Sequence, residues 1–425
     1  MKTLWIQNGL LCCICCAAVS TASAAGTWDY FGSYQLGYSD NLELAPDGGT
    51  SGAYHTLAAG IGYEEHGTRL DGNVDASVEY VNYPSGVFDD ETWLYIDGDL
   101  RWALVRDRLF WVLTDSLTNQ PVDTRAPNVP TNLQQTNVFT TGPSLSYQFN
   151  TANTLKADLR YMNSWAEEDD SFEADRWFAG AGWVYGLTPA DDISLHVTYY
   201  DTDFRQNQGQ EDYRRQSVFG AWERRTGETS VLRAELGLIN VDFEESDNES
   251  GWRALLEWNR TISSSSSLRV SGRHGLTDAA LSIATTADPE TIGNNVVSGD
   301  VYEVTALDVG YNYSWAASTL NVSGSYEKQD YVTSGEIDRD LYGAVAAWTT
   351  HYGGGWSSRF TGDFAWSDYD DGLSDKTYLL YAGVDYASTP NITYTLGVNW
   401  ERRFSDAPDD DYEDWGVVFR VRYDR

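Results

Sequence analysis

The stretch from Leu70 to Tyr80, "LDGNVDASVEY", sorts its side chains strictly by parity. Even-numbered positions carry Leu, Gly, Val, Ala, Val and Tyr, whereas odd-numbered positions carry Asp, Asn, Asp, Ser and Glu. Successive side chains of a β-strand point to opposite faces of the sheet, whereas a helix would mix the two sets. The stretch therefore predicts a strand with one apolar face and one polar face.

The same alternation recurs along the chain, clearest at residues 155–161, 320–326, 356–366 and 392–400. Roughly twenty such segments have the length that a tilted strand needs to cross a bilayer, about ten residues. Short and long connections alternate between them, and nearly all the acidic residues fall in the long set. We expect an all-β fold, a transmembrane antiparallel up-and-down β-barrel of about 18–20 strands with short periplasmic turns and long acidic extracellular loops. A secreted propeller or β-solenoid is the alternative, but neither requires this alternation of loop length.

The composition favours the barrel over most other classes of protein. A net charge of -36 argues against a protein that binds nucleic-acid phosphates. The chain carries 17 Trp, 28 Tyr and 14 Phe, often paired near strand ends, as in Trp28–Tyr30 and Trp183–Tyr185. Such pairs are typical of the aromatic girdles at membrane interfaces.

Residues 1–24 have the pattern of a secretory signal peptide. A charged start at Lys2 precedes an apolar run and the small-residue pattern Ala22-Ser23-Ala24, so cleavage is expected after Ala24. All four cysteines lie within this segment, which excludes a disulfide framework in residues 25–425. We expect residues 25–425 to form a single outer-membrane β-barrel domain in the outer membrane of a Gram-negative bacterium.

Four stretches also resemble a known family of outer-membrane proteins. They are "FGSYQLGYSDNLELA" (31–45), "RDRLFWVLTDSLTNQPVDT" (106–124), "PTNLQQTNVFTTGPSLSYQFNTANTLKADLRY" (130–161) and "EWNRTISSSSSLRVSGRHGLTDA" (257–279). Their small motifs are Tyr38-Ser39-Asp40-Asn41, Trp111-x-Leu113-x-Asp115 and Asn137-x-x-x-Thr141-Gly142-Pro143. In these, and in the order of the motifs, the chain resembles the outer-membrane barrels encoded with exopolysaccharide loci, the EpsL-like and PEP-CTERM-system-associated proteins. The resemblance implies a role in exopolysaccharide export or biosynthesis, as a conduit, and brings no catalytic residues. A general diffusion porin for small solutes is the alternative.

Strand parity predicts which charges face the lumen. Nine basic residues oppose the apolar faces of their strands: Lys156, Arg160, Arg233, Arg253, Arg269, Arg273, Arg359, Arg420 and Arg422. They can form salt-bridge ladders with inward-facing carboxylates, or they can form a path that attracts acidic glycans. Both hypotheses stand on the sequence alone.

Some aromatic residues and two loops are candidates for contacts in the lumen. Aromatic residues on the polar faces near the outer mouth are candidates for stacking on sugar rings, with girdle or loop packing as the alternative: Trp93, Tyr95, Tyr200 and Tyr302. The longest connections, residues 119–136 and 277–299, either fold into the pore or lie outside it. Pro143 is expected near the start of a strand, where a missing amide donor is best tolerated.

The sequence offers no constellation for catalysis or for a bound cofactor. The five histidines lie apart, and no Gly-x-Ser-x-Gly or His-x-x-x-His motif occurs, so an enzyme is not expected. No resident metal or other cofactor is expected, although acidic runs such as Asp409-Asp410-Asp411 could bind Ca²⁺ or Mg²⁺. A solvated charged rim is the alternative.

The last strand is expected to carry the assembly signal. Phe419, Val421 and Tyr423 share its apolar face, with Tyr423 as the last aromatic residue. The expected partners are outer-membrane lipid and lipopolysaccharide, the barrel assembly machinery and polysaccharide export components, with no nucleic acid.

Overall fold

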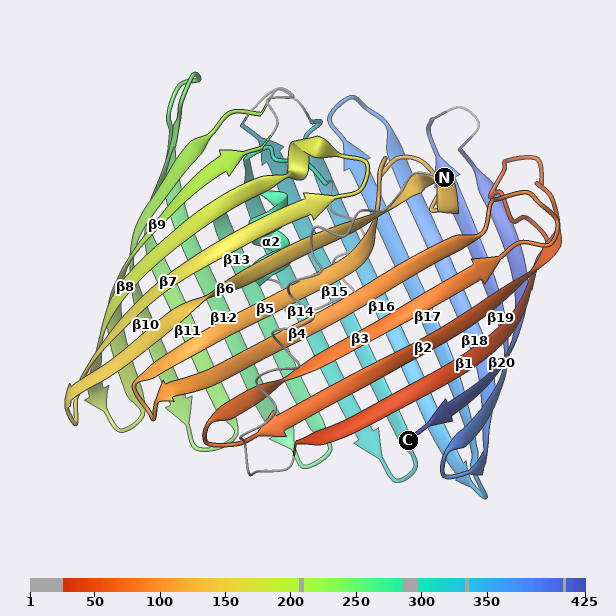
Figure 1. Cartoon of the computed structure of the whole chain (residues 1–425), viewed down its shortest axis with the longest axis horizontal. Helices are drawn as coiled ribbons and strands as arrows, with labels where there is room; N and C mark the ends of the chain where they lie inside the picture. Colours follow the sequence, from red (N-terminus) through yellow and green to blue (C-terminus); the bar gives the residue numbers. More distant parts are fainter. Residues whose placement is uncertain (1–25, 206–209, 286–296, 333–335, 408–409) are drawn as a thin grey trace.

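Twenty strands form one antiparallel sheet that closes on itself (Figure 1). The computed structural model describes residues 26–205, 210–285, 297–332, 336–407 and 410–425, so the predicted signal peptide lies outside the described residues. The strands are β1 (Thr27–Ser39), β2 (Gly52–His66), β3 (Leu70–Asn82), β4 (Glu91–Val105), β5 (Leu109–Pro121), β6 (Leu133–Asn150), β7 (Asn153–Ala166), β8 (Ala174–Thr188), β9 (Asp191–Phe204), β10 (Tyr213–Thr226), β11 (Ser230–Phe243), β12 (Glu249–Ser263), β13 (Ser266–Thr277), β14 (Tyr302–Trp315), β15 (Ser318–Tyr331), β16 (Arg339–Gly353), β17 (Trp356–Tyr369), β18 (Ser374–Thr389), β19 (Ile392–Ser405) and β20 (Tyr412–Asp424).

The first and last strands close the barrel. β1 pairs with β20 from Phe31 opposite Asp424 to Ser39 opposite Gly416. Each remaining strand pairs with its neighbours in sequence. Closure is physically required in a bilayer, because an open edge would leave a row of unpaired amides and carbonyls in hydrocarbon. The barrel prediction is confirmed, at the upper end of its strand range.

Connections alternate in length as the sequence predicts. Turns such as 151–152, 264–265 and 354–355 join the strands at one end, which also holds the C-terminus (Figure 1). The longer connections gather at the other end, including one that contains the helix α2 (Ala279–Thr285) and two that contain the 3-10 helices η2 (Pro130–Asn132) and η3 (Asp170–Phe172). In outer-membrane barrels the short turns are periplasmic and the long loops extracellular. No helix of the described residues is long and apolar enough to cross a membrane.

The outer wall is apolar and the inner wall polar, as parity predicts. In β3, Val78 and Tyr80 are exposed on the outside, while the odd-numbered acidic residues face inward. Large apolar residues stay exposed around the whole circumference, including Leu238 at 71%. An apolar surface of this extent suits lipid rather than water. The chain is therefore an outer-membrane β-barrel.

Two of the sequence motifs, around Trp111 and Asn137, align neighbouring strands. Trp111 Nε1 on β5 donates to Thr141 Oγ1 on β6 at 2.8 Å. Asn137 Nδ2 donates to Asp115 Oδ1 at 2.7 Å across the same two strands. The two motifs thus form one cross-strand ladder, which aligns β5 with β6.

The third motif has a similar structural role at the barrel seam. Asn41 is buried, and its amide donates to the carbonyls of Ala45 at 2.8 Å and Glu413 at 3.0 Å. Ser39 Oγ donates to Asp414 Oδ1 at 2.5 Å. These bonds tie the first outer loop to the last strand.

Pro143 lies well inside β6, and its expected place near a strand start is wrong. The pairing of β6 with β7 passes from Thr141 opposite Tyr161 to Ser144 opposite Asp158, so regular pairing is interrupted around Pro143. Arg160 Nη1 donates to the carbonyl oxygen of Pro143 at 2.6 Å. This interruption accommodates the missing donor without a strand end.

Candidate functional site in the barrel lumen

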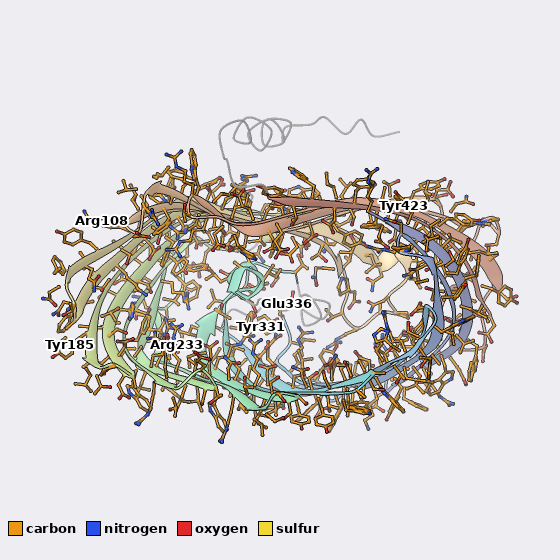
Figure 2. All side chains as sticks on the ribbon, turned by 90° about the horizontal axis from the view of Figure 1, so that it is seen from below. Arg108, Tyr185, Arg233, Tyr331, Glu336 and Tyr423 are labelled. Atoms are coloured by element: carbon orange, nitrogen blue, oxygen red, sulfur yellow. The ribbon has the colours of Figure 1, made fainter. Side chains whose placement is uncertain are left out.

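All nine predicted basic residues face the lumen. Register along the sheet places each on the face opposite the exposed apolar residues of its strand. Viewed from below, the barrel is an elliptical ring with Arg233 and Glu336 inside it and Arg108, Tyr185 and Tyr423 outside (Figure 2). The strand pairing thus places these nine side chains on the lumenal face of the sheet.

Five of the nine form ion pairs with neighbouring carboxylates. Glu235 is shared by Arg233 and by Arg253, whose Nη2 lies 2.6 Å from the carboxylate. The other pairs are Arg160–Asp158 at 2.9 Å, Arg273–Glu327 at 2.7 Å and Arg422–Asp424 at 2.7 Å. The salt-bridge ladder therefore accounts for these five residues.

The other four have no ion pair with any residue that the structure describes: Lys156, Arg269, Arg359 and Arg420. Arg420 instead donates through Nε and Nη2 to the neutral Oε1 of Gln35, at 2.9 and 2.6 Å. These positive charges are thus balanced by no contacting carboxylate and face the lumen.

An acidic arc occupies another part of the wall. Asp75 and Glu79 on β3 face inward beside Asp97 and Asp99 on β4, and Asp75 lies directly opposite Asp97. Within the described residues, none of the four forms an ion pair. The lumen therefore carries uncompensated charge of both signs on separate strands.

Aromatic rings support two of the lumenal arginines from beneath. The guanidinium of Arg253 lies 3.7 Å from the centroid of Phe219, and that of Arg422 lies 4.0 Å from Phe31. Phe31 in turn occupies the space above Gly60, where a Cβ would collide with its ring. Cation–π contacts of this kind hold the guanidinium groups against the wall.

The connection after β13 folds into the barrel and packs on its wall. Ala279, Ala280 and Ile283 of α2 are buried against Val138 and Met162, which face inward from β6 and β7. Figure 2 shows this helix inside the ring. Residues 286–296 of this connection lie outside the described residues. For the part described, the inward-folded alternative is confirmed.

A buried polar cluster anchors α2. Asp278, Arg176 and Tyr213 are all fully or nearly fully buried. Tyr213 donates its hydroxyl to Asp278 Oδ2, and Arg176 Nη2 lies 3.6 Å from the same oxygen. Asp278 Oδ1 also accepts from the backbone amide of Leu281 at 2.8 Å. The sequence prediction missed Arg176 and Asp278. The available signal was their position, since Arg176 lies near the start of β8 and Asp278 directly follows β13, each next to a long loop.

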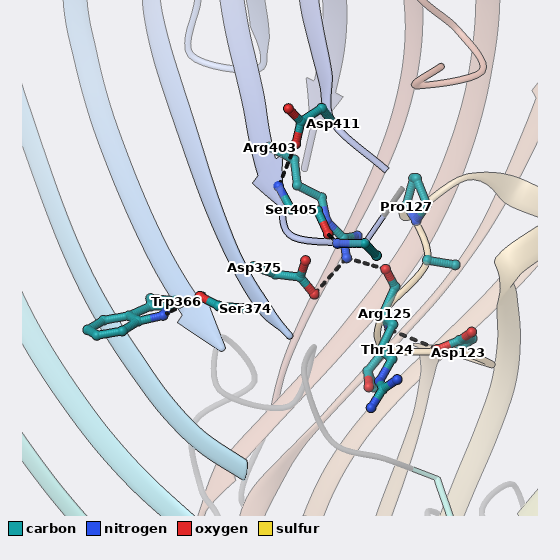
Figure 3. A network of polar contacts seen from close by, with 12 residues as sticks. Asp123, Thr124, Arg125, Pro127, Trp366, Ser374, Asp375, Arg403, Ser405 and Asp411 are labelled. Atoms are coloured by element: carbon teal, nitrogen blue, oxygen red, sulfur yellow. Dashed lines mark hydrogen bonds and ion pairs between the residues drawn. The ribbon is translucent and has the colours of Figure 1, made fainter. Parts of the chain in front are cut away.

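The connection between β5 and β6 also folds inward and reaches strands far along the sheet. We call residues 122–132 the strap. It is shorter than the predicted loop 119–136, because β5 continues to Pro121 and β6 already begins at Leu133. Arg403 Nη2 donates to the carbonyl of Arg125 and lies 2.9 Å from Asp375 (Figure 3). Thr124 Oγ1 accepts from Arg339 Nη1 at 3.2 Å. The strap therefore connects the β5–β6 side of the mouth to β16, β18 and β19.

Carboxylates from four connections gather at the outer mouth. Burial is the main cause that raises the pKa of Glu336, and the nearby carboxylate of Asp300 is the second. Asp169 and Asp123 raise the pKa further, whereas Arg339 lowers it. These acids come from segments that are distant in sequence. Burial and the nearness of like charges account for the raised pKa of Glu336.

Three of the four predicted sugar-stacking residues have no free ring face, which corrects that prediction. Trp93 and Tyr302 point inward but are only 8% and 2% exposed. Tyr200 stacks on Phe178 with centroids 4.7 Å apart and packs against the α2 cluster. Tyr95 is half-buried and accepts a hydrogen bond from Asn119 at 3.1 Å. The packing of α2 against Tyr200 joins segments that are distant in sequence, so the strand pattern alone does not reveal it.

The described residues contain no cluster of three or more His, Cys, Asp or Glu placed to hold a metal ion. Asp409, in the acidic run considered for Ca²⁺ or Mg²⁺, lies outside the described residues. His196 faces the lumen 2.9 Å from Ser194 Oγ and stacks on Phe219. The three residues predicted as the assembly signal lie on the lipid-facing side of β20: Phe419, Val421 and Tyr423.

No protein-family model matches the chain, and a search of the curated proteins finds no match. Among solved structures, the chain is similar to Pseudomonas aeruginosa OpdK with vanillate, at 9% identity and TM-score 0.38, over 94% of this chain and 99% of that one. It is also similar to the FrpB iron transporter of Neisseria meningitidis, at 9% identity and TM-score 0.49, over 93% and 82% of the chains. At these scores the likeness carries no inference about what this chain transports, and the barrel assignment rests on the strand pairing.

Proposed function

We propose that this barrel is a passage through the outer membrane for acidic glycans and that it supports exopolysaccharide export or biosynthesis as a conduit. The observation that carries the proposal is the division of uncompensated charge in the lumen. Unpaired cations such as Arg359 and Arg420 can hold glycan carboxylates, and the acidic arc can accept hydrogen bonds from sugar hydroxyls. The resemblance in motifs to exopolysaccharide-locus barrels supports the same assignment. The chain acts in this proposal without catalysis or a cofactor.

A general diffusion porin is the second candidate. The inward-folded strap and α2 favour it, because segments that narrow the mouth restrict passage by size. A porin would admit small solutes of either charge and would have no particular relation to polysaccharide.

Gene deletion separates the two functions. Loss of secreted acidic polysaccharide with unchanged uptake of small solutes supports the conduit, whereas the reverse result supports the porin. Reversal potentials of the purified barrel in a planar bilayer provide an independent test under a salt gradient. Clear cation selectivity would contradict the passage of acidic glycans.

A further inference from the structure

A cavity of about 550 Å³ lies on the lumenal side of β16–β20, close to the periplasmic turn at residues 354–355. Its lining includes Arg359, Tyr381, Asp385, Thr395, Arg420 and Arg422. None of the inward-folded loops contributes to the lining. The cavity is thus separate from the strap and the α2 cluster.

Tyr381 provides a flat surface in this cavity. Its ring occupies the space above Gly383 and Gly397, which pair directly across β18 and β19; a Cβ on Gly397 would lie 2.6 Å from the ring atoms. The ring must therefore lie along the wall, with one face toward the glycines and the other toward the lumen. No arginine among the described residues covers that face, in contrast to Phe31 and Phe219. The half-buried Tyr381 thus keeps an open ring face.

Two unpaired arginines stand beside this ring. Arg359 lies opposite Gly383 on the neighbouring strand, and both Arg359 and Arg420 are exposed to the lumen. Arg422 also lines the cavity, but Asp424 neutralises it at 2.7 Å. The site therefore offers two guanidinium groups that have no carboxylate partner within the described part of the chain.

The polar groups that remain suit hydroxyls. Asp385 Oδ1 accepts from Thr395 Oγ1 at 2.6 Å and has further acceptor capacity toward the cavity. His351 contributes a second polar ring to the lining. An aromatic face, two arginines and a carboxylate acceptor together match a ring with an apolar C–H face, an acidic substituent and hydroxyl groups.

We infer that Tyr381, Arg359 and Arg420 form a binding subsite for a hexuronate residue of an acidic glycan at the periplasmic end of the lumen. The C–H face of the pyranose would stack on Tyr381, its carboxylate would bind the arginines, and its hydroxyls would donate to Asp385. This inference rests on the proposed passage of acidic glycans. It adds the site in the barrel at which a glycan arriving from the periplasm first binds.

The test is blockade of single-channel current by oligogalacturonate added to the periplasmic side of the intact barrel. Arg359→Gln and Arg420→Gln should each weaken blockade about tenfold, because each removes a charge-assisted hydrogen bond. Arg269→Gln is the matched control, since Arg269 is also unpaired, exposed and lumenal but lies on β13 outside the cavity. Tyr381→Phe should retain binding, whereas Tyr381→Ala should lose it.

Several results would overturn the subsite. Equal weakening by Arg269→Gln would show diffuse attraction rather than a site, and equal blockade by neutral malto-oligosaccharides would exclude recognition of the carboxylate. A barrel that conducts and is blocked, but with no loss in Arg359→Gln, contradicts the subsite alone. A barrel that passes no acidic glycan contradicts the proposed function itself.

Discussion

Arg125 Nη2 lies 2.7 Å from the carboxylate of Asp371, although 246 residues separate them in the chain. Arg125 belongs to the strap between β5 and β6, and Asp371 to the connection between β17 and β18. The Arg125 guanidinium also lies 4.7 Å from the ring centroid of Tyr369. Polar contacts thus hold the strap across part of the outer mouth.

Weakening the strap should open the pore. Asp371→Asn and Arg125→Ala should each raise the open-pore population about twofold to fivefold, because a partly exposed ion pair contributes little on its own. Arg403→Gln should have the larger effect, since Arg403 and Asp375 are nearly buried and Arg403 also binds the strap backbone. Single-channel conductance in planar bilayers measures the change. Asp370→Asn is the matched control, and an equal effect there would contradict the assignment.

Acidification should tighten the mouth through Glu336. Because the pKa of Glu336 is raised in the folded state, its ionisation destabilises the packed loops as pH rises above the ordinary value of 4.5. Hydrogen bonding to Arg125 lowers the pKa of Asp371 instead, so the strap pair persists until the pH falls below the ordinary value of 3.8. Conductance should therefore fall as pH is lowered toward 4.5 and recover at still lower pH.

Glu336→Gln tests that pH dependence directly. At neutral pH the variant should show the low conductance that the unmodified barrel reaches only near pH 4.5, because the neutral amide removes the repulsion from Asp300. Its conductance should therefore change little with pH above 4.5. A profile identical to that of the unmodified barrel would exclude Glu336 as the titrating group.

Removing the Asp278 carboxylate should release α2 from the wall. Asp278→Asn leaves the buried guanidinium of Arg176 without its counter-charge. Breaking a buried ion pair in this way destabilises the folded state by about 3–5 kcal/mol. The chain has no cysteine after residue 16, so a single Ala280→Cys reports exposure of the helix without background from residues 25–425. Maleimide labelling should become about a hundredfold faster or more with Asp278→Asn.

A double replacement supplies the control for this anchor. Arg176→Met with Asp278→Leu should restore slow labelling, because apolar residues of similar volume often replace a buried ion pair without loss of stability. Fast labelling in the double variant, together with slow labelling in Asp278→Asn, would contradict the role assigned to the ion pair.

The last residues should be required for assembly. Deletion of 423–425 removes a lipid-facing aromatic ring and the two backbone hydrogen bonds between Tyr30 and Arg425, at 2.9 and 3.0 Å. Surface labelling and heat-modifiable gel mobility should show loss of the inserted barrel. Tyr423→Phe should assemble normally and Arg425→Gln is the matched control. Normal surface exposure after the deletion would refute the assignment.

The wall of this barrel could be predicted from sequence because lipid and lumen impose opposite chemistry on alternate residues. That rule alone orients Lys156 and Arg422 correctly, although they lie on strands at different parts of the ring. The motifs around Trp111 and Asn137 also carry register information, which becomes readable only when the two strands are paired.

The interior could not be predicted in the same way, because packing between distant segments has no local period. Nothing near Tyr302 or Trp93 in the sequence indicates that their rings are buried. The open face of Tyr381 depends on Gly397 in the next strand, and the anchor of α2 depends on Arg176, about a hundred residues before it. Parity gives the direction of a side chain, while its exposure depends on what folds over it.

The contrast between wall and strap implies two separate melting events. Neighbouring strands pair along most of their length, whereas the strap reaches its distant partners through a few side-chain bonds to residues such as Asp371, Arg403 and Arg339. Local opening in proteins begins where few contacts hold a segment. Gentle heating or mild denaturant should therefore make the outer membrane leaky through this protein well before the barrel itself unfolds.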